Sequence, residues 1–327
     1  AVGFSPASIQ VGATTTKTFT ITNLNGANAL TNVTFNDTLF NTFLSSTTTG
    51  GNCVSPTFLP ALTVNGTAIN ATVPNLAAGA SCTITVTVSS NTSSPLGGHI
   101  NSPSGPTSTQ TAAPGTTTSA GLMAYASPTI AKAFSPSAVA ASTTNASTVT
   151  FTITNPNVST LNNVNFSDAF PATLDLPVQT FGGTCPTPYV PSSLVALLPS
   201  PVTLTIAGLN LPGNTTCTIT VLVNTNAVGI LNNTTSGVKS TQTPIAGAAS
   251  NTATLGVGSI GVTKSFSPTV VVVGGTTTLT LAFINAGGNA TNLRWTDNLV
   301  GYQVAATPNF TQSAGCTGAG WATTAPV

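Results

Sequence analysis

Four of the five cysteines occur at matched places in a sequence that repeats. Cys53 and Cys82 stand 29 residues apart in the first copy, and Cys185 and Cys217 stand 32 residues apart in the second. This spacing predicts one disulfide inside each copy, formed in an oxidising compartment. Metal ligation, the alternative, lacks a Cys-x-x-Cys pair and a second histidine. We expect no metal and no cofactor.

The fifth cysteine, Cys316, belongs to a third copy that stops at Val327, before a second cysteine strand. The spacing in the first two copies places its partner further along a longer chain. We therefore expect Cys316 to be unpaired here, and the sequence to be a piece of a longer protein.

A lysine, an asparagine and an aspartate recur together in the second and third copies. They are Lys132, Asn155 and Asp168, and then Lys264, Asn285 and Asp297. A buried neutral lysine attacks a side-chain amide if a carboxyl group carries the proton, which gives a Lys–Asn isopeptide link. The alternative is a lysine–aspartate ion pair near a domain junction. The first copy has Val2 at the lysine position, so a role for this lysine is not general.

The aspartates also recur alone, as Asp37, Asp168 and Asp297. Catalysis by a carboxylate pair needs two acids, and a calcium site needs several oxygen ligands. One aspartate at the end of a strand is typical of a turn cap, whose carboxylate accepts backbone N–H groups. We expect these three to be structural turn acids.

Composition excludes several functions. Charged residues make up 3% of the chain, there is no Glu, and the formal net charge is +1 without a basic cluster, so nucleic acid is not an expected partner. No apolar run approaches the ~18 residues of a membrane-spanning helix. His99, the single histidine, lacks a serine or cysteine partner pattern and is expected in an exposed loop. With so few acids, bases and free thiols, we expect no enzyme.

The elements that hold these residues follow from three copies of one phrase. Phe-Ser-Pro recurs at Phe4, Phe134 and Phe266, at intervals of 130 and 132 residues. Each copy continues with segments in which apolar and small polar residues alternate, such as residues 16–23, 147–155 and 276–285, a period typical of half-buried strands. No helical apolar stripe of useful length appears.

These patterns predict an all-β protein of tandem immunoglobulin-like β-sandwich repeats. The expected domains are residues 1–127, 128–258 and 259–327, the last incomplete. The links between copies are short, at residues 124–129 and 256–261, and leave little hinge freedom. The predicted shape is a semi-rigid rod.

Taken together, the motifs resemble a known family. The frame K-[AS]-F-S-P, T-x-T-[IF]-T-N, N-V-x-F-x-D and G-x-x-C-T-[IV]-T-V is similar to the bacterial conserved-repeat family of Ig-like surface modules, domain of unknown function eleven and its relatives. The resemblance covers essentially the whole chain. It implies tandem modules of large secreted or surface-anchored prokaryotic proteins and no catalytic residues.

The expected function is therefore an extracellular structural protein that forms a cell-surface stalk or a fibre. Its expected partners are copies of itself or other surface-protein segments, because a surface with so little charge resists association weakly. The alternative is an adhesin whose repeats bind carbohydrate or protein directly, with an unidentified host or matrix ligand. An aromatic cluster at one loop end of every copy would favour the adhesin, and none is visible.

Overall fold

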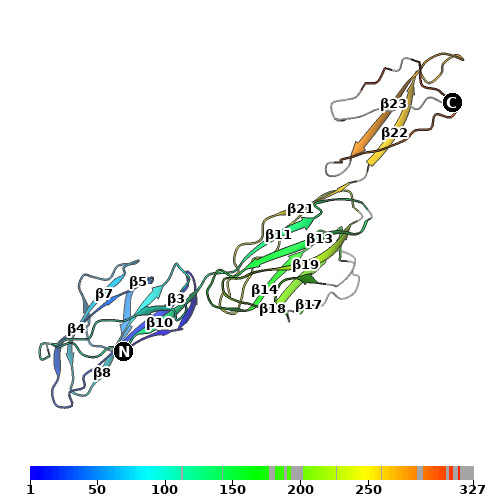
Figure 1. Cartoon of the computed structure of the whole chain (residues 1–327). Coiled ribbons are helices and arrows are strands. Elements are labelled where there is room, and N and C mark those ends of the chain that lie inside the picture. Colours follow the sequence, from blue (N-terminus) through cyan, green and yellow to red (C-terminus); the bar gives the residue numbers. More distant parts are fainter. Residues whose placement is uncertain are drawn as a thin grey trace.

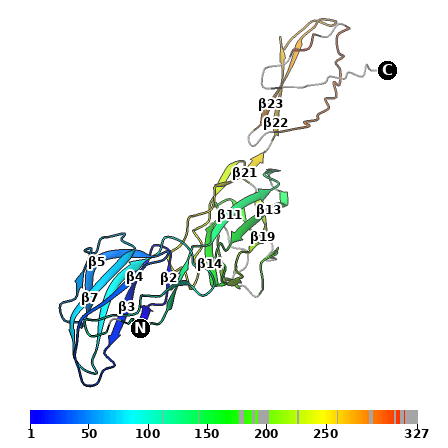
Figure 2. The same ribbon diagram turned by 60° about the vertical axis from the view of Figure 1, so that its left-hand side comes forward.

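The computed structural model describes residues 1–111, 113–141, 143–176, 181–187, 190–192, 202–225, 227–258, 260–285, 290–306, 309–311 and 316. Every regular element among them is a β-strand, and none is a helix. Figures 1 and 2 show three bodies arranged end to end, with the N-terminus in the first. We call them repeat 1 (β1–β10), repeat 2 (β11–β21) and repeat 3 (β22–β23). The predicted all-β class is confirmed.

Repeat 1 is a sandwich of two antiparallel sheets with a small third sheet at its side. The first sheet has the order β1 (Val2–Ser5), β3 (Thr14–Thr22), β8 (Ser81–Ser89), β5 (Phe43–Gly51). The second has the order β4 (Leu30–Thr38), β7 (Ala68–Leu76), β6 (Thr57–Phe58). The third has the order β2 (Ser8–Gln10), β10 (Ala120–Tyr125), β9 (His99–Asn101), and its β2–β10 pairing is parallel.

Repeat 2 has the same plan. Its first sheet has the order β11 (Thr129–Ser135), β13 (Thr143–Thr154), β19 (Thr216–Thr225), β15 (Leu174–Asp175), and β16 (Gly182–Gly183) also pairs with β19. The second has the order β14 (Leu161–Ala169), β18 (Thr203–Leu211), β17 (Val190–Ser192). The third has the order β12 (Ala138–Ala140), β21 (Ala253–Gly258), β20 (Gly229–Asn233), and β12 pairs with β21 in parallel. Antiparallel sheets closed by one parallel strand pair fit an immunoglobulin-like sandwich.

The core of each sandwich lies between its first two sheets and follows the alternation of the strands. In repeat 1 the side chains of Phe19 and Ile84 from the first sheet are buried against those of Phe35 and Val73 from the second. The rings of Phe19 and Phe35 lie 5.0 Å apart, and the corresponding rings of repeat 2, Phe151 and Phe166, lie 5.3 Å apart. The recurring aromatic positions are thus the centres of the two cores.

The repeated Phe-Ser-Pro phrase forms one local structure three times. Its Ser–Pro peptide bond is cis in every copy. The proline carbonyl then accepts a hydrogen bond from a hydroxyl group at the start of the next long strand: from Thr15 to Pro6, from Ser147 to Pro136, and from Thr277 to Pro268, at 2.6, 2.7 and 2.6 Å. This contact attaches the opening strand to its neighbour in each repeat.

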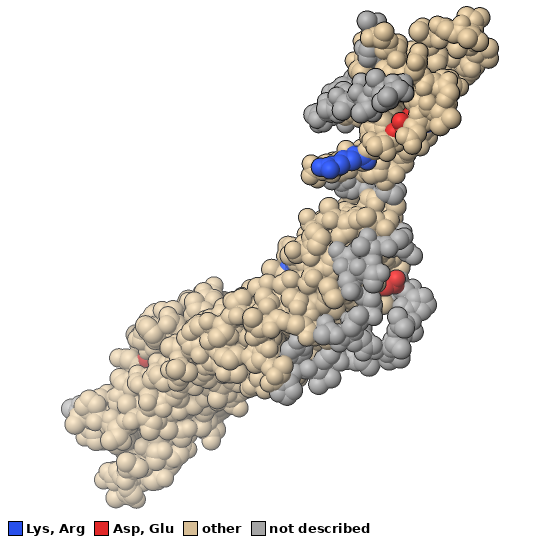
Figure 3. All heavy atoms as spheres, turned by 45° about the vertical axis from the view of Figure 1, so that its right-hand side comes forward, with Lys and Arg blue, Asp and Glu red and all other residues tan. Residues whose placement is uncertain are grey.

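In repeat 3, β22 (Ile260–Ser267) pairs with β23 (Thr278–Asn285) in antiparallel register. The ring of Phe283 lies 5.5 Å from that of Trp295. This aromatic pair corresponds to Phe19 with Phe35 in repeat 1 and to Phe151 with Phe166 in repeat 2. No helix among the described residues is long and apolar enough to cross a membrane. On the face that Figure 3 shows, the described residues are almost entirely uncharged.

Candidate functional site

The core of repeat 1 contains a lysine, an aspartate and an asparagine in mutual contact. Lys17 lies on β3 at a core-facing position, two residues before the buried Phe19, and its side chain is fully buried. Its Nζ donates to Oδ2 of Asp37, on β4 of the opposite sheet, and to Oδ1 of Asn101, on β9. Three sheets therefore each supply one member of this cluster, which we call cluster 1 (Lys17, Asp37, Asn101).

Repeat 2 has the same arrangement. Lys132 lies on β11 between the buried Ile130 and Phe134, and its Nζ donates to Oδ2 of Asp168 on β14 and to Oδ1 of Asn233 on β20. The side chains of this lysine and aspartate are also fully buried. We call this group cluster 2 (Lys132, Asp168, Asn233).

The asparagine amide is held in the same orientation in both clusters. Asn101 Nδ2 donates to the carbonyl of Thr38 at 2.7 Å, and Asn233 Nδ2 donates to the carbonyl of Ala169 at 2.9 Å. Each of these carbonyls belongs to the residue that follows the cluster aspartate. Asn233 Nδ2 also donates to Oδ1 of Asp168 at 2.9 Å. The amide carbon is thereby fixed beside the lysine nitrogen.

Phenylalanine rings surround both lysines. Lys17 Nζ lies 4.9 Å from the ring centre of Phe19 and 5.6 Å from that of Phe4. Lys132 Nζ lies 4.6 Å from the ring centre of Phe170 and 5.3 Å from that of Phe151. Ring faces attract a cation, but they also exclude water from it.

Burial governs the ionisation of the two clusters. Loss of hydration lowers the pKa of Lys17 and of Lys132, against the attraction of Asp37 and Asp168. Loss of hydration also raises the pKa of Asp168, against Lys132 and Asn233. One carboxylate oxygen of Asp37 is buried without a hydrogen-bond partner among the described residues. Burial therefore favours the uncharged forms of both amines and of Asp168.

The structure corrects two expectations at these residues. Asn155 does not contact Lys132. Its Nδ2 donates to the carbonyls of Ser159, Leu211 and Pro212, so Asn155 organises the loop that follows β13. Asp37 and Asp168 are not turn caps, because they lie inside strands and accept lysine Nζ donors. The correct amide partners, Asn101 and Asn233, were missed, and so was Lys17 in repeat 1.

A weak signal for the missed asparagines exists in the sequence. Asn101 and Asn233 follow the Phe-Ser-Pro phenylalanine by 97 and 99 residues and lie between the cysteine strand and the last strand of their copies. His99, two residues before Asn101, is buried and not in an exposed loop. Its Nε2 lies 3.2 Å from Ser90 Oγ and 3.2 Å from the carbonyl oxygen of Thr92.

In repeat 3 the lysine–aspartate pair is present but partly exposed. Lys264 Nζ lies 2.9 Å from Oδ1 of Asp297, and the two side chains are 36% and 21% exposed. Asn285 pairs with Ile260, four residues along β22 from Lys264, so the strand register separates it from that lysine. The ion pair forms here without the expected asparagine.

The structure bonds Cys53 to Cys82 and Cys185 to Cys217, as the spacing predicts. Each bond ties the segment after a Gly-Gly pair to β8 or β19. Gly51, at φ 102°, passes so close to β8 that a Cβ would lie 2.1 Å from the carbonyl oxygen of Thr83. Gly183 approaches Thr218 in the same way. Cys316 is exposed and unbonded.

Side-chain amides connect repeat 1 to repeat 2. Gln10 on β2 donates to Oγ of Ser127 at 2.9 Å and exchanges two hydrogen bonds with the backbone of Ile245. Asn157 exchanges two hydrogen bonds with the backbone of Ala126, both at 2.8 Å. Four hydrogen bonds to backbone groups restrict rotation at this junction.

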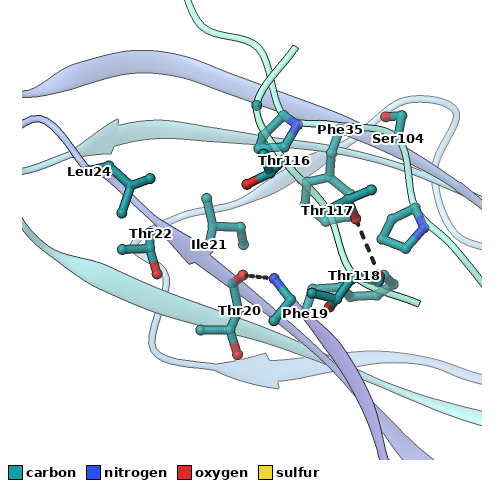
Figure 4. Close-up of a pocket in the computed structure, with 14 residues that line it drawn as sticks. Phe19, Thr20, Ile21, Thr22, Leu24, Phe35, Ser104, Thr116, Thr117 and Thr118 are labelled. Carbon is teal, nitrogen blue, oxygen red and sulfur yellow. Dashed lines mark hydrogen bonds between the residues drawn. The ribbon is translucent and has the colours of Figure 1, made fainter. Parts of the chain in front are cut away.

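A hollow of about 240 Å³ opens on repeat 1 beside its N-terminus. Figure 4 shows its walls: Phe19, Ile21 and Leu24 from one side and Thr116, Thr117 and Thr118 from the other. No acidic or basic side chain and no thiol lines it. Nor do the described residues gather three histidine, cysteine or acidic side chains that could hold a metal ion. Among the described residues, the two lysine clusters bring together an amine, a carboxyl group and an amide that could react with one another.

Comparison with solved structures finds bacterial proteins at low similarity. The C-terminal domain of the AgI/II polypeptide BspA of Streptococcus agalactiae is 12% identical, with a TM-score of 0.43, over 76% of this chain and 94% of that one. The full-length major pilin SpaD of Corynebacterium diphtheriae is 15% identical, with a TM-score of 0.33, over 80% and 69%. At these TM-scores the likeness carries no argument about function.

Sequence comparison gives the family. No curated protein matches the chain. The family described as "Domain of unknown function (DUF7933)" matches residues 2–124, 128–257 and 261–326, one segment for each repeat. Kinship with domain of unknown function eleven stays a prediction. Since the three matches together span nearly the whole sequence, the chain belongs to the DUF7933 family.

Proposed function

We propose that the chain is part of an extracellular structural protein whose repeats form a stalk or fibre on a prokaryotic cell surface. The observation that carries this proposal is the end-to-end arrangement of the repeats with a junction fixed by hydrogen bonds from Gln10 and Asn157. A chain whose role is to hold two points apart or to carry mechanical load needs folded units joined by stiff links. We take residues 1–127, 128–258 and 259–327 as those units.

Two further observations support an extracellular position. Each sandwich contains a disulfide, and disulfides persist in oxidising compartments. The face in Figure 3 shows very few charged side chains, and charged residues make up 3% of the chain, so electrostatic repulsion between copies is weak. Copies of the chain, or other segments of surface proteins, are the partners that this surface fits.

Small-angle X-ray scattering of the purified chain tests the stalk. We expect an elongated particle whose profile agrees with the linear arrangement of Figure 1. Replacing both junction amides, Gln10→Ala with Asn157→Ala, should make the particle flexible. Gln110→Ala is the matched control, because Gln110 bonds to Thr31 within repeat 1. A compact particle, or a double variant as stiff as the parent, would contradict the proposal.

Surface position and assembly need separate tests. Antibodies against repeat 2 should label intact source cells as strongly as permeabilised ones, and labelling only after permeabilisation would exclude a position on the cell surface.

Light scattering of the chain at high concentration and low salt should show association, because few charges oppose contact. A strictly monomeric chain would contradict the fibre and would be consistent only with a stalk made of single chains.

The alternative, repeats that bind a carbohydrate or protein ligand, has one favourable observation. The hollow on repeat 1 combines apolar and threonine side chains with the exposed Leu24. Binding of a glycan array or of matrix proteins by the parent chain, lost in Leu24→Asp and kept in Leu59→Asp, would favour this alternative. Leu59 is an equally exposed leucine of repeat 1 that does not line the hollow.

A further inference from the structure

The two clusters are unusual because this chain has so few charges. It has five basic and four acidic side chains, and four of these nine are buried as Lys17 with Asp37 and Lys132 with Asp168. Replacing a buried ion pair by apolar side chains of similar volume is often neutral or stabilising. A contribution to stability therefore does not account for keeping two such pairs of buried charges.

Each pair also contacts an amide carbonyl in a way that no ion pair needs. Lys17 Nζ meets Oδ1 of Asn101, and Lys132 Nζ meets Oδ1 of Asn233, while the amide nitrogen is held on the opposite side by a backbone carbonyl. The amide carbon of each asparagine is therefore directly next to a primary amine. An amine, an amide carbon and a carboxyl group held together in a water-poor site are the components of an acyl-transfer reaction.

The protonation states suit that reaction. Burial lowers the pKa of both lysines and raises the pKa of Asp168, so transfer of one proton from lysine to aspartate gives a neutral amine and a neutral acid. A neutral amine has the free electron pair that attacks a carbonyl carbon, and a neutral carboxylic acid donates a hydrogen bond to its oxygen.

We propose that each cluster forms an intramolecular amide bond, Lys17 to Asn101 in repeat 1 and Lys132 to Asn233 in repeat 2. Lysine Nζ attacks the asparagine Cγ, and the aspartic acid gives its proton to Oδ1. The resulting aspartate removes a proton from Nζ and passes it to Nδ2. The bond between Cγ and Nδ2 then breaks, ammonia leaves, and Oδ1 returns its proton to the aspartate, which restores the carbonyl group and the neutral acid. No oxidant, metal or cofactor takes part.

The products fit the site. The new amide keeps one N–H and one carbonyl oxygen, and the carboxyl group of Asp37 or Asp168 bonds to both. The ring faces of Phe19 and of Phe170, which would hold an ammonium ion, then pack on an uncharged amide. The link removes the buried charges altogether, which resolves the cost of burying them.

The links would also change how a repeat bears load. In repeat 1 the bond joins β3, which pairs with the opening strand β1 in the first sheet, to β9, 84 residues further on. In repeat 2 it joins residues 101 apart. Force between the ends of a repeat would pass through the link, and the residues between its two ends could not extend. The inference does not depend on the proposed stalk, since the bond is tested by mass alone.

Repeat 3 is an internal comparison. Its Lys264–Asp297 pair is partly exposed, and Asn285 lies away from it along the strand. We propose no link at Lys264 in this chain.

Intact mass of the reduced chain, purified from a folded preparation, is the first test. Each link removes one ammonia, so we expect a mass about 34 Da below that calculated from the sequence, or about 17 Da per repeat. A mass equal to the calculated one would overturn the proposal, and a deficit of one ammonia would overturn it for one repeat.

Trypsin then locates the links, because the chain has cleavage sites only at Lys17, Lys132, Lys239, Lys264 and Arg294. An acylated lysine is not cleaved. After reduction and denaturation, a linked chain should give residues 1–239 as one piece, while cleavage at Lys239 and Lys264 shows that the digestion is complete. Separate peptides 1–17, 18–132 and 133–239 would overturn the proposal.

Variants identify the chemistry. Asn233→Ala should restore cleavage after Lys132 and leave Lys17 uncleaved, whereas Asn232→Ala, at the exposed neighbouring amide, should change nothing. Asp168→Ala should also restore cleavage after Lys132, and Asp175→Ala, an exposed acid of the same repeat, is its control. A link that still forms in Asp168→Ala would remove the aspartate from the mechanism. Because the parent chain is decisive by itself, misfolding of a variant leaves the proposal falsifiable.

Discussion

Repeats 1 and 2 build the same cluster with the lysine on different strands. In repeat 1, β1 carries Val2 and its neighbour β3 carries Lys17, whereas in repeat 2, β11 carries Lys132 and β13 carries Val149. In both, the aligned strand positions hold one lysine and one valine, with the two exchanged. What the two repeats share is the place of the amine in space, opposite the aspartate and the asparagine.

This exchange shows that the cluster is a unit. A lysine kept only for its own strand would stay at one position of the repeat. Since the side chain is long and both strands face the same core, either position lets Nζ reach the carboxylate and the amide. Repeat 3 follows repeat 2, with Lys264 on its first strand and Leu279 at the position of Val149.

The largest expected effect comes from breaking and then rebuilding the cluster of repeat 1 in the form of repeat 2. Lys17→Val leaves Asp37 buried without its partner and should lower the free energy of unfolding of repeat 1 by about 3–5 kcal/mol. Adding Val2→Lys should recover most of that loss. Hydrogen exchange of β3 and β8 measures it, with repeat 2 as the internal reference. A double variant no better than the single one would show that the strand of origin matters.

Loss of a disulfide should come next, and it should affect the two repeats alike. Cys53→Ala with Cys82→Ala opens a loop of 29 residues, and Cys185→Ala with Cys217→Ala opens one of 32. Each pair of changes should destabilise its own repeat by roughly 3–4 kcal/mol. Calorimetry of the two variants checks this. A large difference between them would show that the two sandwiches depend on their disulfides unequally.

A smaller effect is expected at the glycine beside each disulfide. Gly51→Ala and Gly183→Ala place a Cβ 2.1 Å from a carbonyl oxygen of β8 or β19, at a φ that side chains avoid. Each should cost about 1–3 kcal/mol. Gly3→Ala, where a Cβ meets nothing within 4 Å, is the matched control. An unchanged melting temperature in Gly51→Ala would mean that this segment shifts without cost.

The smallest effect is expected from pH, because the attraction within each pair opposes the loss of hydration. In Asn233→Ala, Lys132 cannot be linked and its pKa is lowered, so the unfolded chain holds this proton longer than the folded one. Stability of repeat 2 should therefore rise as the pH increases towards the ordinary lysine value of 10.5. The raised pKa of Asp168 acts oppositely, lowering stability as the pH rises above 3.8.

The parent chain gives the contrast. If Lys132 is an amide it does not titrate, so the alkaline rise should be present in Asn233→Ala and absent in the parent and in Asn232→Ala. Calorimetry between neutral pH and pH 10 measures the difference. An alkaline rise of equal size in all three would mean that the lysine of the parent is free.

Much of the fold follows from local pattern. The period of two in residues 16–23 and 147–155 places strands correctly, and the matched cysteine offsets give both disulfides. The same period of two also predicts which way the side chain of Asp37 faces. Asp37 stands two residues after the buried Phe35, so it faces the core and is not a turn cap. The expectation of a turn cap was wrong because it considered only that Asp37 is an isolated acid near a strand end, and not the alternation that buries its side chain.

The amide partners could not be found in this way. Asn155 is nearer to Lys132 in sequence than Asn233 is, but the strand register carries it to the far end of the sheet, where it holds a loop. Asparagine is frequent in this chain, and its residue type does not distinguish a loop amide from a cluster amide. The contact with the lysine is made only when the third sheet closes on the sandwich.

The sequence by itself determined the three repeats, their all-β class, the disulfide pairs and the low surface charge, because each depends on residue type and local spacing. Only the tertiary structure decided which side chains meet inside. Cluster 1 joins β3, β4 and β9, and cluster 2 joins β11, β14 and β20. The three strands of each cluster belong to three different sheets, so the packing of these sheets sets the geometry. The physical reason is that contact between distant strands depends on register and sheet packing, which alternation along one strand does not encode.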